Sequence, residues 1–119
     1  MKNLMDLDIW KEARKQTKEI YLLMKLMPDD EKFGLTSQIK RCSVSISSNI
    51  AEGSSRKSNK DFSRFLEIGL GSCFEMETQL LLCSDVGYLS LGKVEDQIEQ
   101  VQILERRISA FMNYLSKNK

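Results

Sequence analysis

Residues 58–86 read SNKDFSRFLEIGLGSCFEMETQLLLCSDV, and this stretch decides the fold. Ser58 places a capping hydroxyl three positions before the carboxylate of Asp61, which is close to the spacing of a capping box. The helix predicted from this start runs to Val86 and stops at Gly87. Its apolar side chains point in several directions, and a helix that is apolar all round is buried on all sides. One small bundle rarely buries a helix completely, so the pattern favours an oligomer.

Three further helices are predicted around this stretch. In residues 6–27, apolar side chains recur at three- and four-residue steps until Pro28 ends the helix. Residues 36–52 carry a partial four-residue repeat, and residues 90–117 show nearly a heptad seam. Short connections imply antiparallel neighbours. The predicted fold class is therefore all-α: an up-down-up-down antiparallel four-helix bundle that forms a single domain over residues 1–119.

The composition excludes much familiar chemistry. The chain has no His, so neither a Ser-His-Asp nor a Cys-His arrangement is available. Cys42, Cys73 and Cys83 form no C-x-x-C pair, which predicts buried, reduced thiols in the cytoplasm rather than disulfides or a zinc site. No apolar run approaches the ~20 residues that cross a bilayer, and the first residues lack the apolar stretch of a signal peptide. We expect no enzymatic activity, metal, cofactor, small-molecule substrate or membrane partner.

The net charge of +1 hides an uneven distribution. Residues 1–60 carry 12 basic and 8 acidic side chains, a net charge of +4, whereas residues 61–119 carry 6 and 9, a net charge of −3. The predicted nucleic-acid contact is a basic cluster around the end of the second helix and the start of the third: Lys40, Arg41, Arg56, Lys57, Lys60 and Arg64. Such a cluster can meet phosphates, and the alternative is a solvated helix end. No aromatic residue lies among these positions, so base stacking is not predicted.

A series of short motifs runs through the chain in a fixed order. The series reads DIW (8–10), VSISSNIAEG (44–53), KDF (60–62), GS (71–72), EMETQL (75–80) and GYL (87–89). It resembles the four-helix-bundle family of the 23S rRNA intervening-sequence protein, closely over about residues 7–89 and by pattern only in the last helix. Ser47 stands where that family commonly has proline, which would mark a kink in the second helix.

The resemblance implies a bundle that assembles into a homo-oligomeric ring, a homopentamer with a central channel. Members of the family are encoded within insertions in bacterial rRNA genes. A related protein, the accessory protein of diversity-generating retroelements, forms such a ring and works with a reverse transcriptase and nucleic acid. The partners implied are therefore further copies of the chain and structured RNA or a nucleic-acid-processing enzyme. In a ring, weak basic patches on each subunit would join into one belt.

The central motif also predicts a polar network. Asn49 and Glu52 are three residues apart and share a helix face, next to Gly53. Arg41 and Arg56 are candidates to pair with Glu52. The network is predicted to fix the second helix against the third or against a neighbouring subunit, and the alternative is a site that lines the ring.

Two functions remain open from the sequence. The first is a non-enzymatic, ring-forming module that contacts RNA or a nucleic-acid-processing partner through basic helix ends. The alternative is a protein-binding or scaffolding oligomer without nucleic-acid contact, in which the charges serve solubility. A third possibility is a carboxylate enzyme that uses Glu52 with Glu75 or Glu77, which requires a concave pocket around these side chains.

Overall fold

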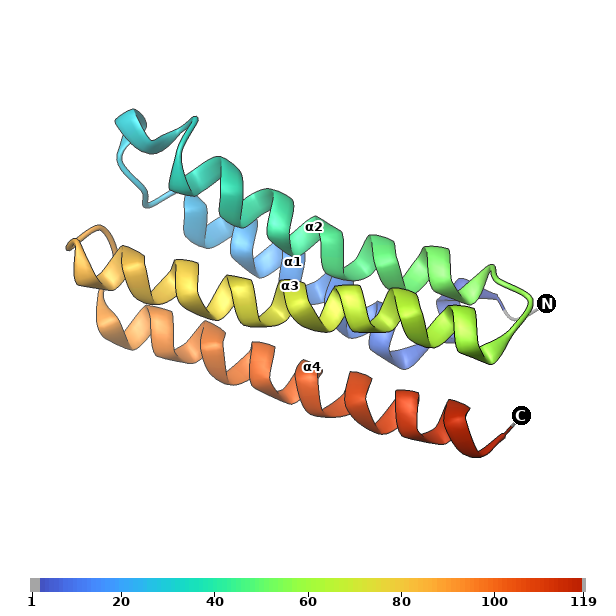
Figure 1. Cartoon of the computed structure of the whole chain (residues 1–119). Helices are drawn as coiled ribbons and strands as arrows, with labels where there is room; N and C mark the ends of the chain where they lie inside the picture. Colours follow the sequence, from blue (N-terminus) through green and yellow to red (C-terminus); the bar gives the residue numbers. More distant parts are fainter. Residues whose placement is uncertain (1–2, 119) are drawn as a thin grey trace.

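A computed structural model describes residues 3–118 and contains four long helices. Their bounds are α1 Asp8–Met24, α2 Leu35–Ser54, α3 Asn59–Asp85 and α4 Leu91–Lys117, with single 3-10 turns at Leu4–Asp6 (η1) and Asp29–Glu31 (η2). Each helix runs antiparallel to the one before it, in a bundle of 47 × 21 × 20 Å (Figure 1). The described residues contain no strand. The predicted all-α, four-helix fold is confirmed.

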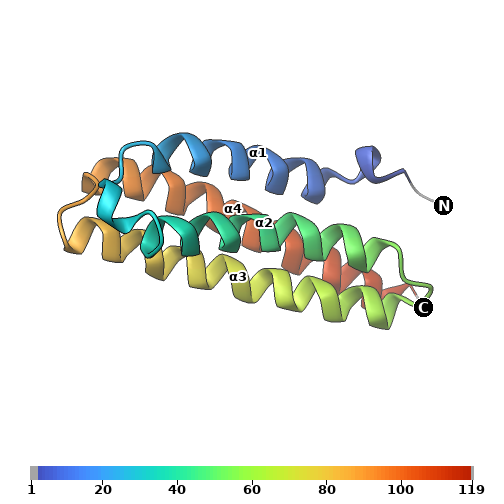
Figure 2. The same cartoon turned by 90° about the horizontal axis from the view of Figure 1, so that it is seen from above.

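The helices surround a common core with α1 and α3 on opposite sides. Seen from above, α2 and α4 lie between these two helices (Figure 2). The most extensive contacts between helices are those of α2 with α3 and of α3 with α4. Within the part of the chain that the structure describes, no helix is long and apolar enough to cross a membrane.

The two ends of α3 explain why this helix begins and stops where it does. Ser58 Oγ accepts a hydrogen bond of 3.1 Å from a backbone N–H in the first helical turn. After the last turn, Gly87 has a φ of +83°, and its N–H donates to the Ser84 carbonyl at 3.1 Å. The N–H of Tyr88 donates to the Cys83 carbonyl at 2.8 Å. This is a Schellman motif, and glycine adopts its left-handed position without steric cost.

Two helix ends differ from their predictions. α1 ends at Met24 rather than at Met27, and the chain already turns over residues 25–27. The N–H groups of residues 25–27 each donate to the carbonyl three residues back, so the end of the helix tightens into a 3-10 turn before Pro28. α2 continues through Gly53 to Ser54, because this glycine is packed inside the bundle rather than ending the helix.

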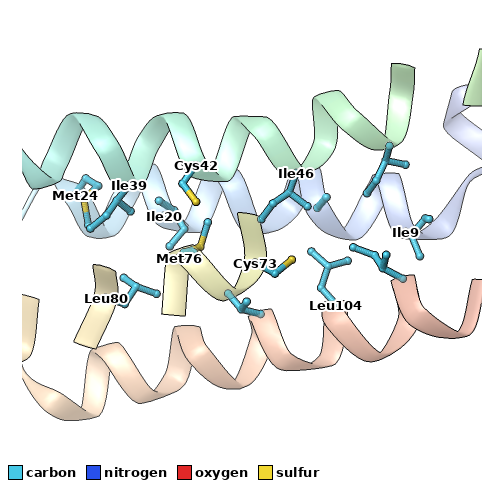
Figure 3. Packing of buried hydrophobic residues seen from close by; sticks show 14 of the residues in the cluster. Ile9, Ile20, Met24, Ile39, Cys42, Ile46, Cys73, Met76, Leu80 and Leu104 are labelled. Atoms are coloured by element: carbon cyan, nitrogen blue, oxygen red, sulfur yellow. The ribbon is translucent and has the colours of Figure 1, made fainter. Parts of the chain in front are cut away.

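The core is a line of apolar side chains along the bundle axis. Figure 3 shows Ile20, Ile39 and Met76 among the side chains that meet between the helices. Removing one such side chain from water contributes about 1.5–3 kcal/mol. The largest fully buried side chains are Ile20, Ile39, Ile46, Ile50, Leu66, Cys73, Met76, Leu80, Val94, Val101, Leu104 and Ile108.

α3 is not buried on all sides in the single chain, as expected for one small bundle, and the oligomer that would cover its open side stays a prediction. Its exposed large apolar side chains include Ile68 (55% exposed), Phe74 (56%), Leu81 (43%) and Leu82 (43%), which we call the outer face of α3. α3 packs mainly against α2 and α4, and a helix with two neighbours keeps one side open. The apolar residues on that side therefore remain without cover in one subunit.

Candidate nucleic-acid interface

The structure divides the six predicted basic residues into two groups. The turn between α2 and α3 and the first turns of α3 carry Arg56, Lys57, Lys60 and Arg64, which we call the turn group. Lys40 and Arg41 lie near the start of α2. Since a helix rises ~1.5 Å per residue, they are roughly 20 Å from the turn group along α2. The single cluster predicted from the sequence is therefore not formed.

A groove of about 670 Å³ lies beside the turn group, between the start of α3 and the end of α4. Its lining residues are Lys57, Ser58, Asn59, Lys60, Ser63, Leu115 and Ser116. The Asn59 side-chain amide donates to the Leu115 carbonyl at 3.4 Å and to the Asn118 carbonyl, which ties the two helix ends together. None of the lining side chains is acidic. Lysines, hydroxyls and a helix N-terminus are the groups that bind phosphate in proteins.

Arg56 is held at the edge of the turn by two neighbours. Its guanidinium carbon lies 4.7 Å from the ring centroid of Phe65, and its Nη2 lies 4.0 Å from Glu52 Oε2. The cation-π contact contributes about 0.5–1 kcal/mol, and the exposed ion pair contributes less. The predicted pair with Glu52 forms, whereas the prediction that no aromatic ring lies among the basic residues is wrong. Phe65 directly follows Arg64 in the sequence and could have been noticed there, whereas its contact with Arg56 needed the structure.

Lys40 and Arg41 have different surroundings. Lys40 Nζ lies 4.9 Å from the ring centroid of Tyr21, a half-exposed side chain of α1. Arg41 lines a shallow groove of about 290 Å³ together with the acidic side chain of Glu75. Arg41 does not reach Glu52, because their positions are eleven residues apart and therefore separated by about 16 Å of helix. An acidic neighbour makes this second group less suited to phosphate than the turn group.

Asn49 lies in a polar contact between α2 and α3. Its side-chain amide donates to the Ser45 carbonyl at 2.8 Å and to Ser45 Oγ at 3.1 Å. Ser45 Oγ is in turn 3.0 Å from Ser72 Oγ on α3. Glu52 is not part of this contact, since its exposed side chain faces Arg56 instead. In the sequence Ser72 stood out only as part of the GS motif (71–72), which gives no sign of its partner on α2.

Gly53 sets the closest approach of α2 to α3. A Cβ atom at this position would lie 2.8 Å from Phe62 Cδ1, 2.8 Å from Phe65 Cβ and 3.2 Å from the Phe62 carbonyl oxygen. The last two atoms are fixed by the backbone of α3, so they cannot move aside cheaply. Glycine is therefore required where the chain enters the turn, and it places the turn group relative to the bundle.

The three carboxylates considered for catalysis are dispersed. Glu75 Oε1 accepts a hydrogen bond of 3.2 Å from Cys42 Sγ, and Cys42 lies about 15 Å before Glu52 along α2. Glu77 faces α4, where its Oε1 accepts a hydrogen bond of 3.2 Å from Gln102 Nε2. Glu52 therefore forms no acid-base pair with either residue. Within residues 3–118, no group of three or more Cys, Asp or Glu side chains is placed to hold a metal ion.

The cysteine thiols are buried and weakly acidic. Burial, a hydrogen bond to Glu75 and its charge raise the pKa of Cys42 to about 12. Burial and the nearby carboxylate of Glu105 raise the pKa of Cys73 to about 12, and burial also raises the pKa of Cys83. All three are free thiols. Protonated thiols are poor nucleophiles and metal ligands, so they act as small apolar core groups.

These features define a class of protein: a small four-helix bundle with an apolar outer helix face and a basic groove at one turn. A sequence model of the family described as "23S rRNA-intervening sequence protein" matches residues 5–110. The chain belongs to this family, and the resemblance drawn from the short motifs is confirmed. The match also includes most of α4, which the motifs had covered only by pattern.

A solved structure supports the fold independently. It is described as a protein with unknown function from the S23 ribosomal protein family of Bacteroides thetaiotaomicron. It is 24% identical to this chain, covers 87% of it and 97% of its own chain, and has a TM-score of 0.81. At this identity the likeness shows the fold alone. No protein with a curated description matches the chain.

Proposed function

We propose that this protein is a non-catalytic, self-associating bundle that contacts RNA through the groove at the α2–α3 turn. The observation that carries the proposal is the lining of this groove: Lys57, Lys60 and three serine hydroxyls, with no acidic side chain among them. The family description names the 23S rRNA intervening sequence, so structured fragments of ribosomal RNA are the RNA to test first.

The arrangement of the turn group favours a phosphate backbone over a compact anion. Lys60 and Arg64 are four residues apart and share one face of α3, and Lys57 lies just before that helix. Both lysines are exposed, and neither takes part in the ion pairs of the described residues. A row of exposed positive charges neutralises several phosphates and releases their counterions, so binding should weaken steeply with salt.

A mobility-shift titration with a structured 23S rRNA fragment at low salt tests this proposal. We expect the double variant Lys57→Ala/Lys60→Ala to bind about tenfold more weakly and with a shallower salt dependence. The matched control is Lys40→Ala/Arg41→Ala, which removes the same charge from the remote group and should retain near-wild-type binding. Absence of binding by the wild type, or equal losses in both variants, would contradict the proposal.

Self-association forms the second part of the proposal, with the outer face of α3 as the contact. The side chains of Ile68, Phe74, Leu81 and Leu82 are large, apolar and exposed on one side of α3, with the exposed Glu67 and Glu75 between them. Exposed apolar surface favours a protein contact. Gly71 lies among them, and a Cβ atom there would have no neighbour within 4 Å. A ring of five copies, as the family resemblance implies, would repeat the basic groove around its circumference. In light scattering, a mass of 13.7 kDa would contradict this part.

The absence of catalysis is supported by the dispersed carboxylates and the protonated thiols, and a cytoplasmic location suits the reduced state of Cys42, Cys73 and Cys83.

The alternative function is a protein-binding or scaffolding oligomer without nucleic-acid contact. The outer face of α3 favours this alternative, because its exposed apolar side chains would bind another protein surface rather than a charged nucleic acid. The RNA titration separates the two functions, because only the first predicts salt-dependent binding that is lost with the turn group.

A further inference from the structure

A carboxyl group is buried where α3 meets α4. The side chain of Glu105 on α4 belongs to a residue that is only 9% exposed, and its Oε2 atom has no hydrogen-bond partner among the described residues. Glu77 of α3 reaches the same face of α4, because its Oε1 accepts a hydrogen bond of 3.2 Å from Gln102 Nε2, three residues before Glu105. Two carboxyl groups bond to each other only when one of them carries a proton, because two carboxylates have no donor.

The charged groups around Glu105 do not neutralise it. Glu77 and Cys73 face it from α3, and the thiol of Cys73 remains protonated and neutral. Arg106, its neighbour on α4, is exposed and forms no ion pair with it within the described residues. From α1, Glu12 Oε1 lies 2.6 Å from Arg107 Nη1, so that arginine is already paired. Glu105 therefore faces a second acid rather than a base, and one shared proton would satisfy both carboxyl groups.

We propose that Glu77 and Glu105 share one proton, and that its loss to water weakens the packing of α3 against α4, so that the bundle responds to pH. In the protonated state the hydroxyl of Glu105 donates to the carboxylate of Glu77. In the deprotonated state two negative charges face each other, one of them buried without a donor on Oε2. The repulsion and the cost of the buried charge are relieved only when the two helices part and water enters.

The direction of the response follows from the proton affinity of the folded chain. Burial, followed by the hydrogen bond and the charge of Glu77, raises the pKa of Glu105 from 4.5 to about 8, against a smaller lowering by Arg106. The folded state therefore holds a proton that the unfolded state releases near pH 4.5. Its contribution to stability is complete below that pH and is lost progressively as the pH rises to about 8.

Thermal unfolding between pH 5 and 9, at one protein concentration, tests the proposal. The variant Glu105→Gln keeps the shape of the side chain without a titratable group. We expect the Tm of the wild type to fall relative to this variant by on the order of 10 °C over this range. The control Glu99→Gln removes the same charge from an exposed position on α4 and should follow the wild-type profile. Parallel profiles for the wild type and Glu105→Gln would overturn the proposal.

A measurement on the wild type alone guards against a variant that fails to fold. With ¹³C-labelled glutamate, the side-chain carboxyl carbons report each proton directly by NMR. We expect one glutamate resonance to titrate near pH 8, far above the ordinary range for this side chain. If every glutamate carboxyl of the folded protein titrates in the ordinary range, no shared proton exists and the proposal is wrong.

Discussion

Large apolar residues lie on both the inner and the outer side of α3, but only those on the inner side are buried. Leu80 is fully buried in the core, and Leu81, the next residue, is 43% exposed. Successive residues on a helix are about 100° apart, so one step moves a leucine from the core to the surface. The inner side forms the core, whereas the outer side leaves large apolar side chains exposed among charged residues such as Glu67 and Glu75. The apolar residues of a helix therefore indicate how much of its surface needs covering, but not which molecule covers it.

The glycines of α3 repeat this contrast. A Cβ atom at Gly69 would lie 3.6 Å from the Ile46 carbonyl oxygen and 3.7 Å from Asn49 Cβ, so this position is already in van der Waals contact with α2. A Cβ atom at Gly71 would meet nothing within 4 Å. Gly69 therefore takes part in the packing of α3 against α2, whereas Gly71 lies on the exposed side of α3 and packs against nothing in the single chain.

We expect the largest change in stability at Leu80, and almost none at the adjacent Leu81. Leu80→Ala should lower the free energy of unfolding by about 2–5 kcal/mol, because it removes a fully buried side chain and leaves a cavity. Leu81→Ala should cost less than about 0.5 kcal/mol in a dissociated chain. Urea unfolding at several protein concentrations measures both. Equal losses at every concentration would break the distinction, whereas a Leu81→Ala loss that grows with concentration would show that another copy covers the outer face.

A smaller effect is expected at the closest approach of α2 to the inner side. Gly53→Ala places a methyl group 2.8 Å from Phe65 Cβ, so α2 and α3 must move apart. The overpacking should exceed the ~1 kcal/mol gain in helix propensity and lower stability by about 1–2 kcal/mol. Circular dichroism should show a lower Tm, with weaker RNA binding because the turn group moves. A raised Tm would contradict this prediction, because it would show that a methyl group fits at position 53 without overpacking.

The smallest effect has the opposite sign. Gly71→Ala should stabilise α3 by about 0.5–1 kcal/mol, because alanine favours helix and meets no neighbour. This is best measured by thermal unfolding in a Phe74→Glu background, where association through the outer face is blocked. A loss of stability in that background would mean that the outer face is packed within the single chain.

The sequence predicted the fold because helices have strong local signals. The cap at Ser58, the stop at Gly87 and the seam of α4 each depend on residues that are near one another in the chain. Prediction failed where surroundings come from another element. The basic residues were counted together by sequence, and the length of α2 sets Lys40 and Arg41 apart from the turn group.

The pairing of Glu77 with Glu105 was beyond the sequence for the same reason. The two residues are 28 positions apart and belong to different helices. The spacing of Glu105 from Val101 and Ile108 places it beside the seam of α4, but does not say which residue of another helix meets it. Phe65 under the guanidinium of Arg56 is a similar case. Contacts between helices depend on rotation and register, which periodicity sets only to within about a turn.

The most direct test of the contrast between the two sides of α3 is the mass of the protein in solution. Multi-angle light scattering should give the wild type a mass several times 13.7 kDa, with five copies expected from the family resemblance. Phe74→Glu, at a position 56% exposed, should reduce it to 13.7 kDa, whereas Leu22→Glu on α1, at a position 54% exposed, should leave it unchanged. A wild type of 13.7 kDa, or equal dissociation by both variants, would contradict the account.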